Sequence, residues 1–272
     1  MKKYLFLAFI FVQQFCQAQY LELGVGAGAG FFKGDLSHTL PGSIKEGQPA
    51  FGLFVRSNPS DYISYKLMFN YASVSGRDKH AIEDDLLKRD LSFRSSILEL
   101  GLQLEYNIMG YQPYGLSSPF SPYIFVGVAG FKFNPQTRYN NDWVDLRPLK
   151  TEGQAYKNLS VSVPLGFGVK YALNDHWNLG AELGFRPTLT DYLDDVSKTY
   201  LSKSELLING GQVAADLGNK IDAPSGLKRG NNSGVDWYHI LQFTVSYNFL
   251  DNGLVGSRGR LKRRAGCRQS IF

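Results

Sequence analysis

Long apolar runs are missing from this chain of 272 residues. A transmembrane helix needs about 20 consecutive apolar residues, and no segment after residue 18 comes close to that length. Charged residues are also sparse, at 19% of the chain, whereas glycine (29 residues), tyrosine (16) and phenylalanine (19) are plentiful. This composition suits either a membrane β-barrel or a soluble domain of two sheets.

Cysteine is nearly absent, with only Cys16 and Cys267 in the chain. Cys16 lies in a segment that resembles a secretory signal, with Lys2 and Lys3, an apolar core and a small-residue cleavage site after Ala18. Removal of this segment would leave Cys267 alone in an oxidising compartment, where it cannot form an internal disulfide. We expect it to form an intermolecular disulfide or to remain an inert thiol, and both alternatives stay open.

Motifs for catalysis are missing too. No pair among the four histidines has metal-ligand spacing, and no Gly-x-Ser-x-Gly or comparable nucleophile motif occurs. His239 next to a Trp-Tyr pair is interpreted as an aromatic-belt residue at the membrane surface rather than a catalytic base. We therefore expect no enzymatic activity and no cofactor, with a lipid-modifying barrel enzyme as the less favoured alternative.

Alternation with a period of two dominates what remains, and residues 159–171 show it most clearly. Every odd position from Leu159 to Tyr171 is apolar or aromatic, and the even positions hold small or polar residues. Such a strand has one oily face, and thirteen residues tilted by about 40° span about 30 Å, the thickness of a hydrocarbon core. Pro164 cannot donate a ladder hydrogen bond, so a bulge or a local kink is expected there.

Seven further segments alternate in the same way. The predicted strands cover residues 20–31, 50–57, 62–74, 93–108, 122–133, 159–171, 177–189 and 237–250. Connections after the first, third, fifth and seventh strands are long, and the others are shorter. This pattern predicts an all-β fold, an eight-stranded antiparallel transmembrane β-barrel with long extracellular loops and periplasmic termini in a Gram-negative outer membrane. Its predicted parts are a signal peptide (1–18), the barrel (19–250) and a basic periplasmic tail (251–272).

The inward faces of these strands carry four cations and four anions. They are Glu22, Arg56, Lys66, Glu99, Glu105, Lys170, Glu182 and Arg186. An eight-stranded barrel is just wide enough for side chains to fill, and buried charges must be paired. We expect a plug of salt bridges, with a proton or ion path as the alternative.

Two other charged groups stand out. Asp191, Asp194 and Asp195 follow the seventh strand and are interpreted as a solvated acidic turn rather than a calcium site. The tail is basic and could contact acidic proteins or lipid phosphates in the periplasm, where it meets no nucleic acid. Its cations include Arg258, Arg260, Lys262, Arg263 and Arg264.

Several segments together resemble one family. They are Ala50–Arg56, Phe120–Phe125, Phe133–Gln136, Thr190–Ser197 and Asp236–Tyr238. The chain resembles the PorG-type outer-membrane barrels (DUF6089 family) of Bacteroidota. Its most specific match is the acidic segment with Asp191, Asp194 and Asp195, together with Asp236 and Trp237 before the last strand.

This resemblance implies an eight-stranded barrel without catalytic residues. For the PorG branch it also implies membership of the type IX secretion system, where the barrel associates with the periplasmic ring of PorK and PorN. The expected function is therefore a structural or docking component of that system. The alternative is a surface-exposed binding or adhesion barrel that acts through its long loops.

Overall fold

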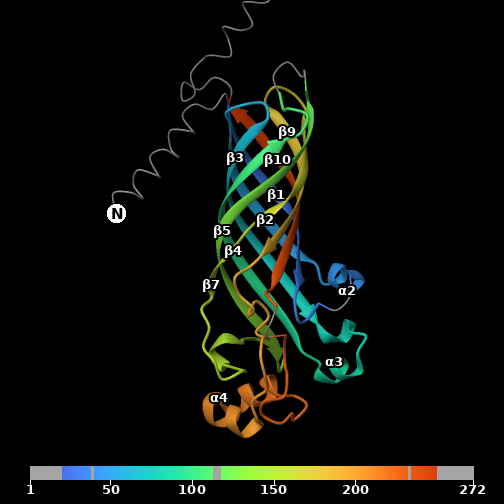
Figure 1. Cartoon of the computed structure of the whole chain (residues 1–272), viewed down its shortest axis with the longest axis vertical. Coiled ribbons are helices and arrows are strands. Elements are labelled where there is room, and N and C mark those ends of the chain that lie inside the picture. The colour runs from blue at the N-terminus through green and yellow to red at the C-terminus, as the bar shows by residue number, and fades with distance from the viewer. Residues whose placement is uncertain (1–19, 38–39, 113–117, 232–233, 250–272) are drawn as a thin grey trace, which may run out of the picture.

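Eight strands form a closed ring in the computed structural model, which describes residues 20–37, 40–112, 118–231 and 234–249. The ring strands are β1 (Tyr20–Lys33), β2 (Gln48–Asn58), β3 (Ile63–Arg77), β4 (Ser92–Asn107), β5 (Phe120–Tyr139), β8 (Leu165–Ala172), β9 (Trp177–Pro187) and β10 (Trp237–Phe249). Each pairs antiparallel with its neighbours, and the pairing of β1 with β10 closes the barrel (Figure 1). The predicted fold class is confirmed.

The outer face of the barrel is apolar over much of its height. On β4, for example, Leu98, Leu100, Leu104 and Tyr106 are all exposed, whereas the intervening Glu99, Gln103 and Glu105 are buried. A barrel with apolar side chains outside and polar ones inside is built for a lipid environment. Among the helices of the described ranges, none is long and apolar enough to span a membrane.

The stretch around Pro164 forms two strands, β7 (Leu159–Ser162) and β8. Both pair with β5, and the partner pairs Ser162 with Ala129 and Leu165 with Val126 leave two residues on each strand between them. The register therefore continues through the break without an inserted residue. The expected bulge is absent: Pro164 has no N–H to donate, but its carbonyl still accepts a hydrogen bond from the backbone amide of Gly127 at 2.7 Å.

β5 extends farther than the alternation predicted. It continues past residue 133 to Tyr139 and folds back as the hairpin strand β6 (Asp142–Asp145). The outward residues of this extension, Asn134, Gln136 and Arg138, are polar because they lie beyond the apolar band. A pattern of oily outward positions cannot detect a strand that has left the membrane.

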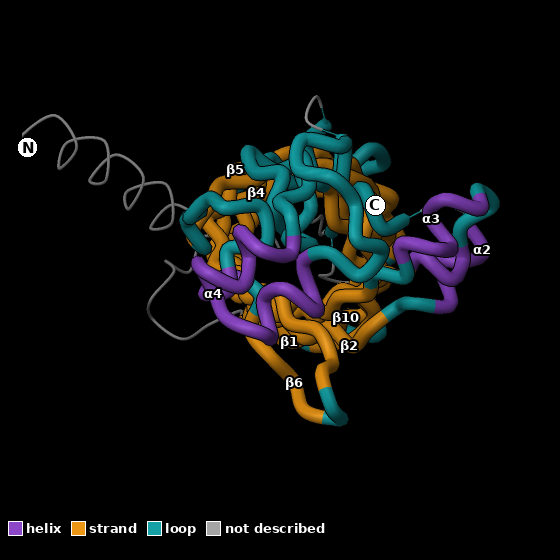
Figure 2. Tube along the Cα trace, turned by 90° about the horizontal axis from the view of Figure 1, so that it is seen from below, coloured by secondary structure: helices purple, strands orange, loops and turns teal. Residues whose placement is uncertain are grey.

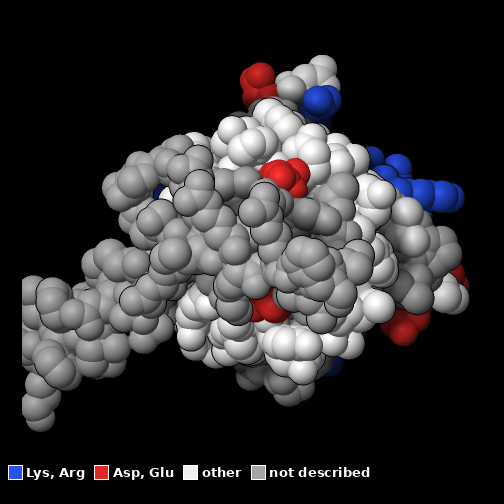
Figure 3. Space-filling model, turned by 90° about the horizontal axis from the view of Figure 1, so that it is seen from above, with Lys and Arg blue, Asp and Glu red and all other residues white. Residues whose placement is uncertain are grey.

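Short and long connections lie at opposite ends of the barrel. The short ones, residues 59–62, 108–119 and 173–176, share one end with the start of β1 and the end of β10. Figure 3 views this end, where most of the described side chains that can be seen are neutral. The long ones carry short helices at the other end: α2 (Leu40–Lys45), η1 (Asp78–His80), α3 (Asp84–Arg89), η3 (Arg147–Leu149) and α4 (Lys203–Gly218).

The long connections fold into a compact cap across the barrel mouth (Figure 2). Its apolar core joins inward residues near the strand ends to loop residues: Phe32, Phe93, Phe131 and Phe133 from strands, Leu146, Leu193, Val196 and Leu217 from the cap. α4 begins with a capping box between Ser202 and Glu205 and bends at Gly211, whose φ of 76° suits glycine. Cap and barrel therefore share one core.

Candidate functional site

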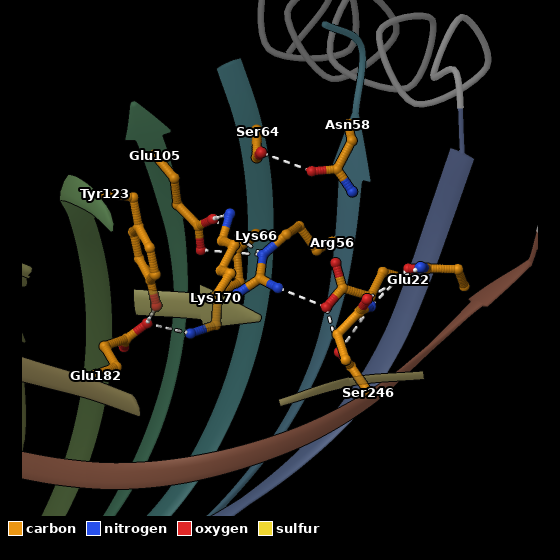
Figure 4. A network of polar contacts seen from close by, with 12 residues as sticks. Glu22, Arg56, Asn58, Ser64, Lys66, Glu105, Tyr123, Lys170, Glu182 and Ser246 are labelled. Carbon is orange, nitrogen blue, oxygen red and sulfur yellow. Dashed lines mark hydrogen bonds and ion pairs between the residues drawn. The ribbon is translucent and has the colours of Figure 1, made fainter. Parts of the chain in front are cut away.

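The barrel lumen is closed by buried ion pairs. Arg56 on β2 bridges two carboxylates, with its Nη1 2.6 Å from Glu22 Oε1 and its Nε 2.9 Å from Glu105 Oε2. Lys170 on β8 reaches across the lumen to the same Glu105 carboxylate at 2.5 Å and to Asn107 Oδ1 at 2.9 Å. Figure 4 shows how these side chains converge from strands on opposite walls.

Two further pairs continue the network toward the cap. Lys66 Nζ lies 2.7 Å from Glu182 Oε2, which also accepts a hydrogen bond from the Tyr123 hydroxyl at 2.8 Å. Arg186 Nε lies 3.0 Å from Glu99 Oε2, and the Tyr238 hydroxyl donates to the same oxygen. These contacts join β3, β4, β5, β9 and β10 across the interior.

All eight predicted lumen residues therefore lie inside the barrel, and each is paired with an opposite charge. None of the eight side chains is more than 4% exposed. Four positive and four negative charges make the network neutral. Aromatic rings pack against its cations, with Lys170 Nζ 4.5 Å from the centre of the Tyr123 ring. Such a filled cross-section leaves the barrel wall rigid.

The cap is held together by two buried arginines that sequence reasoning missed. Arg89 at the end of α3 makes two 2.7 Å hydrogen bonds to the Asp78 carboxylate and donates to the carbonyl of Arg229 at 2.5 Å. Arg229 donates to Glu152 Oε1 at 3.1 Å and to the carbonyl of Asp195 at 2.8 Å. Arg89 also donates to the carbonyl of Asp35 at 3.3 Å, so all four long connections meet at these groups.

The family segment Thr190–Ser197 lies at this junction. Glu152 accepts hydrogen bonds from the backbone amides of Ser197 and Lys198, both at 3.0 Å. The Asp195 carboxylate accepts from the hydroxyls of Thr151 at 2.5 Å and Tyr156 at 2.6 Å. The segment is thus fixed by polar contacts with residues about 40 positions earlier.

Asp236 anchors the segment from the other side. Its carboxylate accepts a hydrogen bond from the backbone amide of Leu193 at 2.8 Å, and its carbonyl accepts one from the hydroxyl of Thr188 at 2.8 Å. The next residue, Trp237, has the Lys33 ammonium 5.6 Å from its ring centre. The family residues therefore connect the last two barrel strands to the cap.

The expectation of a solvated acidic turn is wrong, because Asp194 and Asp195 are buried, each 1% exposed. Burial raises the pKa of Asp195 to about 6, although Arg229 and two hydroxyl donors oppose the shift. Burial also raises the pKa of the half-buried Asp191 to about 6. Burial raises the pKa values of Asp194 and Asp236 well above the usual range. The charge of Asp236 adds to the shift of Asp194, and those of Asp191 and Asp35 add to the shift of Asp236.

No group of three or more acidic, histidine or cysteine side chains in the described ranges could hold a metal ion. His239 packs between Trp237 and the Phe185 ring at the cap end of β10, near the rim of the barrel. Several predictions fall outside the described residues: the predicted signal segment with Cys16, Cys267, and the tail with Arg258, Arg260, Lys262, Arg263 and Arg264.

The fold has relatives among solved outer-membrane barrels. Neisserial surface protein A matches with a TM-score of 0.43 and 9% identity, over 84% of this chain and 97% of that one. OprG from Pseudomonas aeruginosa matches with a TM-score of 0.42 and 16% identity, over 87% and 99%. Ail of Yersinia pestis matches with a TM-score of 0.39 and 11% identity, over 85% and 98%.

No curated protein matches the chain. One family model does: "Domain of unknown function (DUF6089)" matches residues 1–209, which include the barrel from β1 to β9, the acidic segment and the first part of α4. Because this match covers most of the 272 residues, the chain belongs to the DUF6089 family.

Proposed function

We propose that this protein is a non-enzymatic outer-membrane barrel that serves as a docking component of the type IX protein secretion system. The observation that carries the proposal is the neutral network of ion pairs across the lumen. A barrel filled in this way offers no passage for a protein substrate, so its function is left to its two end surfaces. The resemblance of the sequence to PorG-type barrels favours secretion over other roles.

In the proposed orientation, the short connections face the periplasm and the cap faces outward. Bacterial barrels generally have short periplasmic turns and long extracellular loops, and this chain has the same asymmetry. The periplasmic end would then contact ring proteins of the PorK and PorN type. The basic tail and Cys267 would extend the same surface, with Cys267 available for an intermolecular disulfide.

Site-specific photocrosslinking in cells tests the docking surface. A benzophenone residue in place of Met109, 62% exposed at the short-connection end, should trap a ring protein. The matched control places it at Ile208 of α4, 84% exposed on the cap, and should trap none. Ring adducts from Ile208 alone would reverse the orientation. Adducts from neither site, with secretion intact in a deletion strain, would end the proposal.

Two simpler measurements address the remaining parts of the proposal. Cys267→Ser should abolish any disulfide-linked adduct seen on non-reducing gels. Purified barrel in a planar bilayer should show no ion conductance above that of lipid alone. Steady single-channel currents would instead favour the ion-path interpretation of the lumen.

A surface-binding role is the second candidate, favoured by the cap. α4 exposes the apolar residues Leu207 and Ile208 on a rigid support instead of a loose loop. Exposed apolar side chains of this kind are typical of contact surfaces. Replacing both residues with serine should leave secretion unchanged under the docking proposal. Loss of cell adhesion with normal secretion would favour the second candidate.

A further inference from the structure

A polar cleft of about 570 Å³ opens on the barrel wall near the cap, between the ends of β3 and β4 and the β5–β6 hairpin. Among the described residues that line it, four are basic and Asp90 is acidic. The basic residues are Arg77, Lys79, Arg94 and Arg138. The hairpin projects beyond the outline of the barrel in Figure 2 and forms one side of the cleft.

Two of these arginines are held in place by one indole ring. The guanidinium carbons of Arg138 and Arg94 lie 5.2 Å and 5.7 Å from the ring centre of Trp143 on β6. Arg94 is fixed further by a 3.0 Å hydrogen bond from its Nε to Ser73 Oγ. Stacking on an aromatic ring leaves the outer N–H groups of a guanidinium available to a ligand.

The charge of the cleft is not neutralised from within. Arg77 pairs with Glu46 at 3.3 Å, and Asp90 lies 3.5 Å from Lys220. Within the described ranges, no carboxylate lies at ion-pair distance from Lys79, Arg94 or Arg138. The cleft therefore presents three unmatched cations, two of them arginines with planar donor groups that suit phosphate oxygens.

The strand register gives the height of the cleft above the apolar band. Tyr71, Leu98, Lys132 and Leu159 stand side by side on β3, β4, β5 and β7 and form the upper edge of the band. Arg94 faces the same way as Leu98 and lies four residues closer to the cap on β4. At about 3.3 Å per residue and a tilt of about 40°, it lies about 10 Å above that edge.

At this height the backbone of Arg94 lies just outside the lipid headgroups, within reach of its side chain. The headgroup layer on each side of a bilayer is roughly 5–7 Å thick, and arginine side chains reach several ångströms along a surface. Lys132, at the edge of the band itself, adds a fifth cation below the cleft. We propose that the cleft binds the phosphate groups of an anionic lipid in the leaflet on the cap side.

A lipid fits these observations better than a soluble acidic protein does. The cations face sideways from the barrel wall, whereas the end surface of the cap, where a protein would approach, is formed by other residues. Their vertical series from Lys132 to Arg94 and Arg138 follows the path of a lipid that stands against the wall. The orientation proposed above determines only which leaflet supplies the lipid: with the cap outward, it is a phosphorylated glycolipid of the outer leaflet.

Native mass spectrometry of the purified full-length barrel in detergent tests the proposal. The protein is titrated with bisphosphorylated lipid A or with phosphatidylethanolamine. We expect lipid A adducts on the unaltered protein, and about tenfold weaker binding in the double variant Arg94→Gln/Arg138→Gln, from the loss of two charge-assisted contacts. The matched control Arg147→Gln/Lys157→Gln removes two exposed cations elsewhere on the cap and should bind normally.

Each other outcome also has a definite meaning. Equal lipid A binding by the cleft variant and the unaltered protein overturns the proposal. Displacement of lipid A by millimolar inorganic phosphate, or by a polyglutamate peptide, assigns the cleft to a soluble anion or to an acidic protein and overturns it too. If the arginine variant lacks the heat-dependent gel shift of a folded barrel, the double variant Lys79→Gln/Lys132→Gln is used in its place. That variant should also bind lipid A about tenfold more weakly than the unaltered protein. Ring proteins are absent from this assay, so its result is independent of the docking proposal.

Discussion

Replacing Glu105 with glutamine should destabilise the barrel far more than a surface substitution would. The Glu105 carboxylate is fully buried and serves two cations, Arg56 at 2.9 Å and Lys170 at 2.5 Å. Its removal leaves these cations with only the Glu22 carboxylate, so the local charge rises from zero to +1. Removing one partner from a buried pair costs about 3–5 kcal/mol, and we expect about 4 kcal/mol here.

A second substitution should recover most of this loss. Lys170→Met, combined with Glu105→Gln, restores neutrality with Arg56 and Glu22 still paired at 2.6 Å. The free energy of unfolding of the double variant should lie within about 1–2 kcal/mol of that of the unaltered protein, because apolar replacements of buried pairs are often well tolerated. The control combines Glu105→Gln with Arg186→Met, a substitution that breaks the pair between Arg186 and Glu99. The losses of stability from these two substitutions should add.

Urea unfolding of barrel refolded into lipid vesicles provides the measurement. Tryptophan fluorescence reports the transition, because Trp177 and Trp237 lie in barrel strands. A loss of this size requires a lumen dry enough for the charges to interact strongly. A loss below about 1 kcal/mol for Glu105→Gln, the range of solvated ion pairs, would mean that water fills the lumen and would refute the plug.

Three further predictions concern the cap and the packing of the barrel wall. Arg229→Met should free the long connections for proteolysis while the barrel keeps its folded gel mobility, because the buried Glu152 loses its cation. The cap should resist proteinase K better at pH 5 than at pH 7.5, with an unfolded substrate as the reference for protease activity. Folding raises the pKa of Asp195 from 3.8 to about 6, so its protonation stabilises the folded cap by at most roughly 3 kcal/mol. This stabilisation is fully present below pH 3.8 and is lost as the pH rises through 6. Asp195→Asn, which mimics the protonated acid, should reduce that dependence. Gly166→Val should prevent refolding, since a Cβ at Gly166 would lie 2.1 Å from the carbonyl oxygen of Leu183, whereas Phe167→Val on the exposed lipid face should refold.

The membrane part of this fold follows from the sequence because a bilayer imposes a simple rule on it. Every spanning residue faces either lipid or lumen, and alternation from Leu159 to Tyr171 records that choice position by position. The same rule identified Glu105 and Lys170 as inward residues. It could not pair them, because a contact between β4 and β8 depends on closure of the ring and on side-chain reach across it.

The cap follows no such rule. Its key contacts join residues far apart in the chain, such as Arg89 with the carbonyl of Arg229, and no period in the sequence marks them. The acidic segment was misjudged for the same reason. Three aspartates within five residues are typical of a solvated turn, yet Asp194 and Asp195 are buried by loops that start about 40 residues earlier and end about 40 residues later.

The lumen network and the acidic residues of the cap differ in how their charges are compensated. A change of pH can therefore separate their functions in an experiment. In the lumen every carboxylate has a cation as its partner. In the cap, burial raises the pKa of both Asp194 and Asp236, and the Asp236 charge raises the pKa of Asp194 further. One oxygen of the Asp194 carboxylate has no hydrogen-bond partner among the described residues. Mild acid should therefore alter the cap while leaving the barrel intact. A secretion or binding activity that changes between pH 5 and pH 7.5 would then depend on the cap, and one that does not would belong to the opposite end or to the barrel wall.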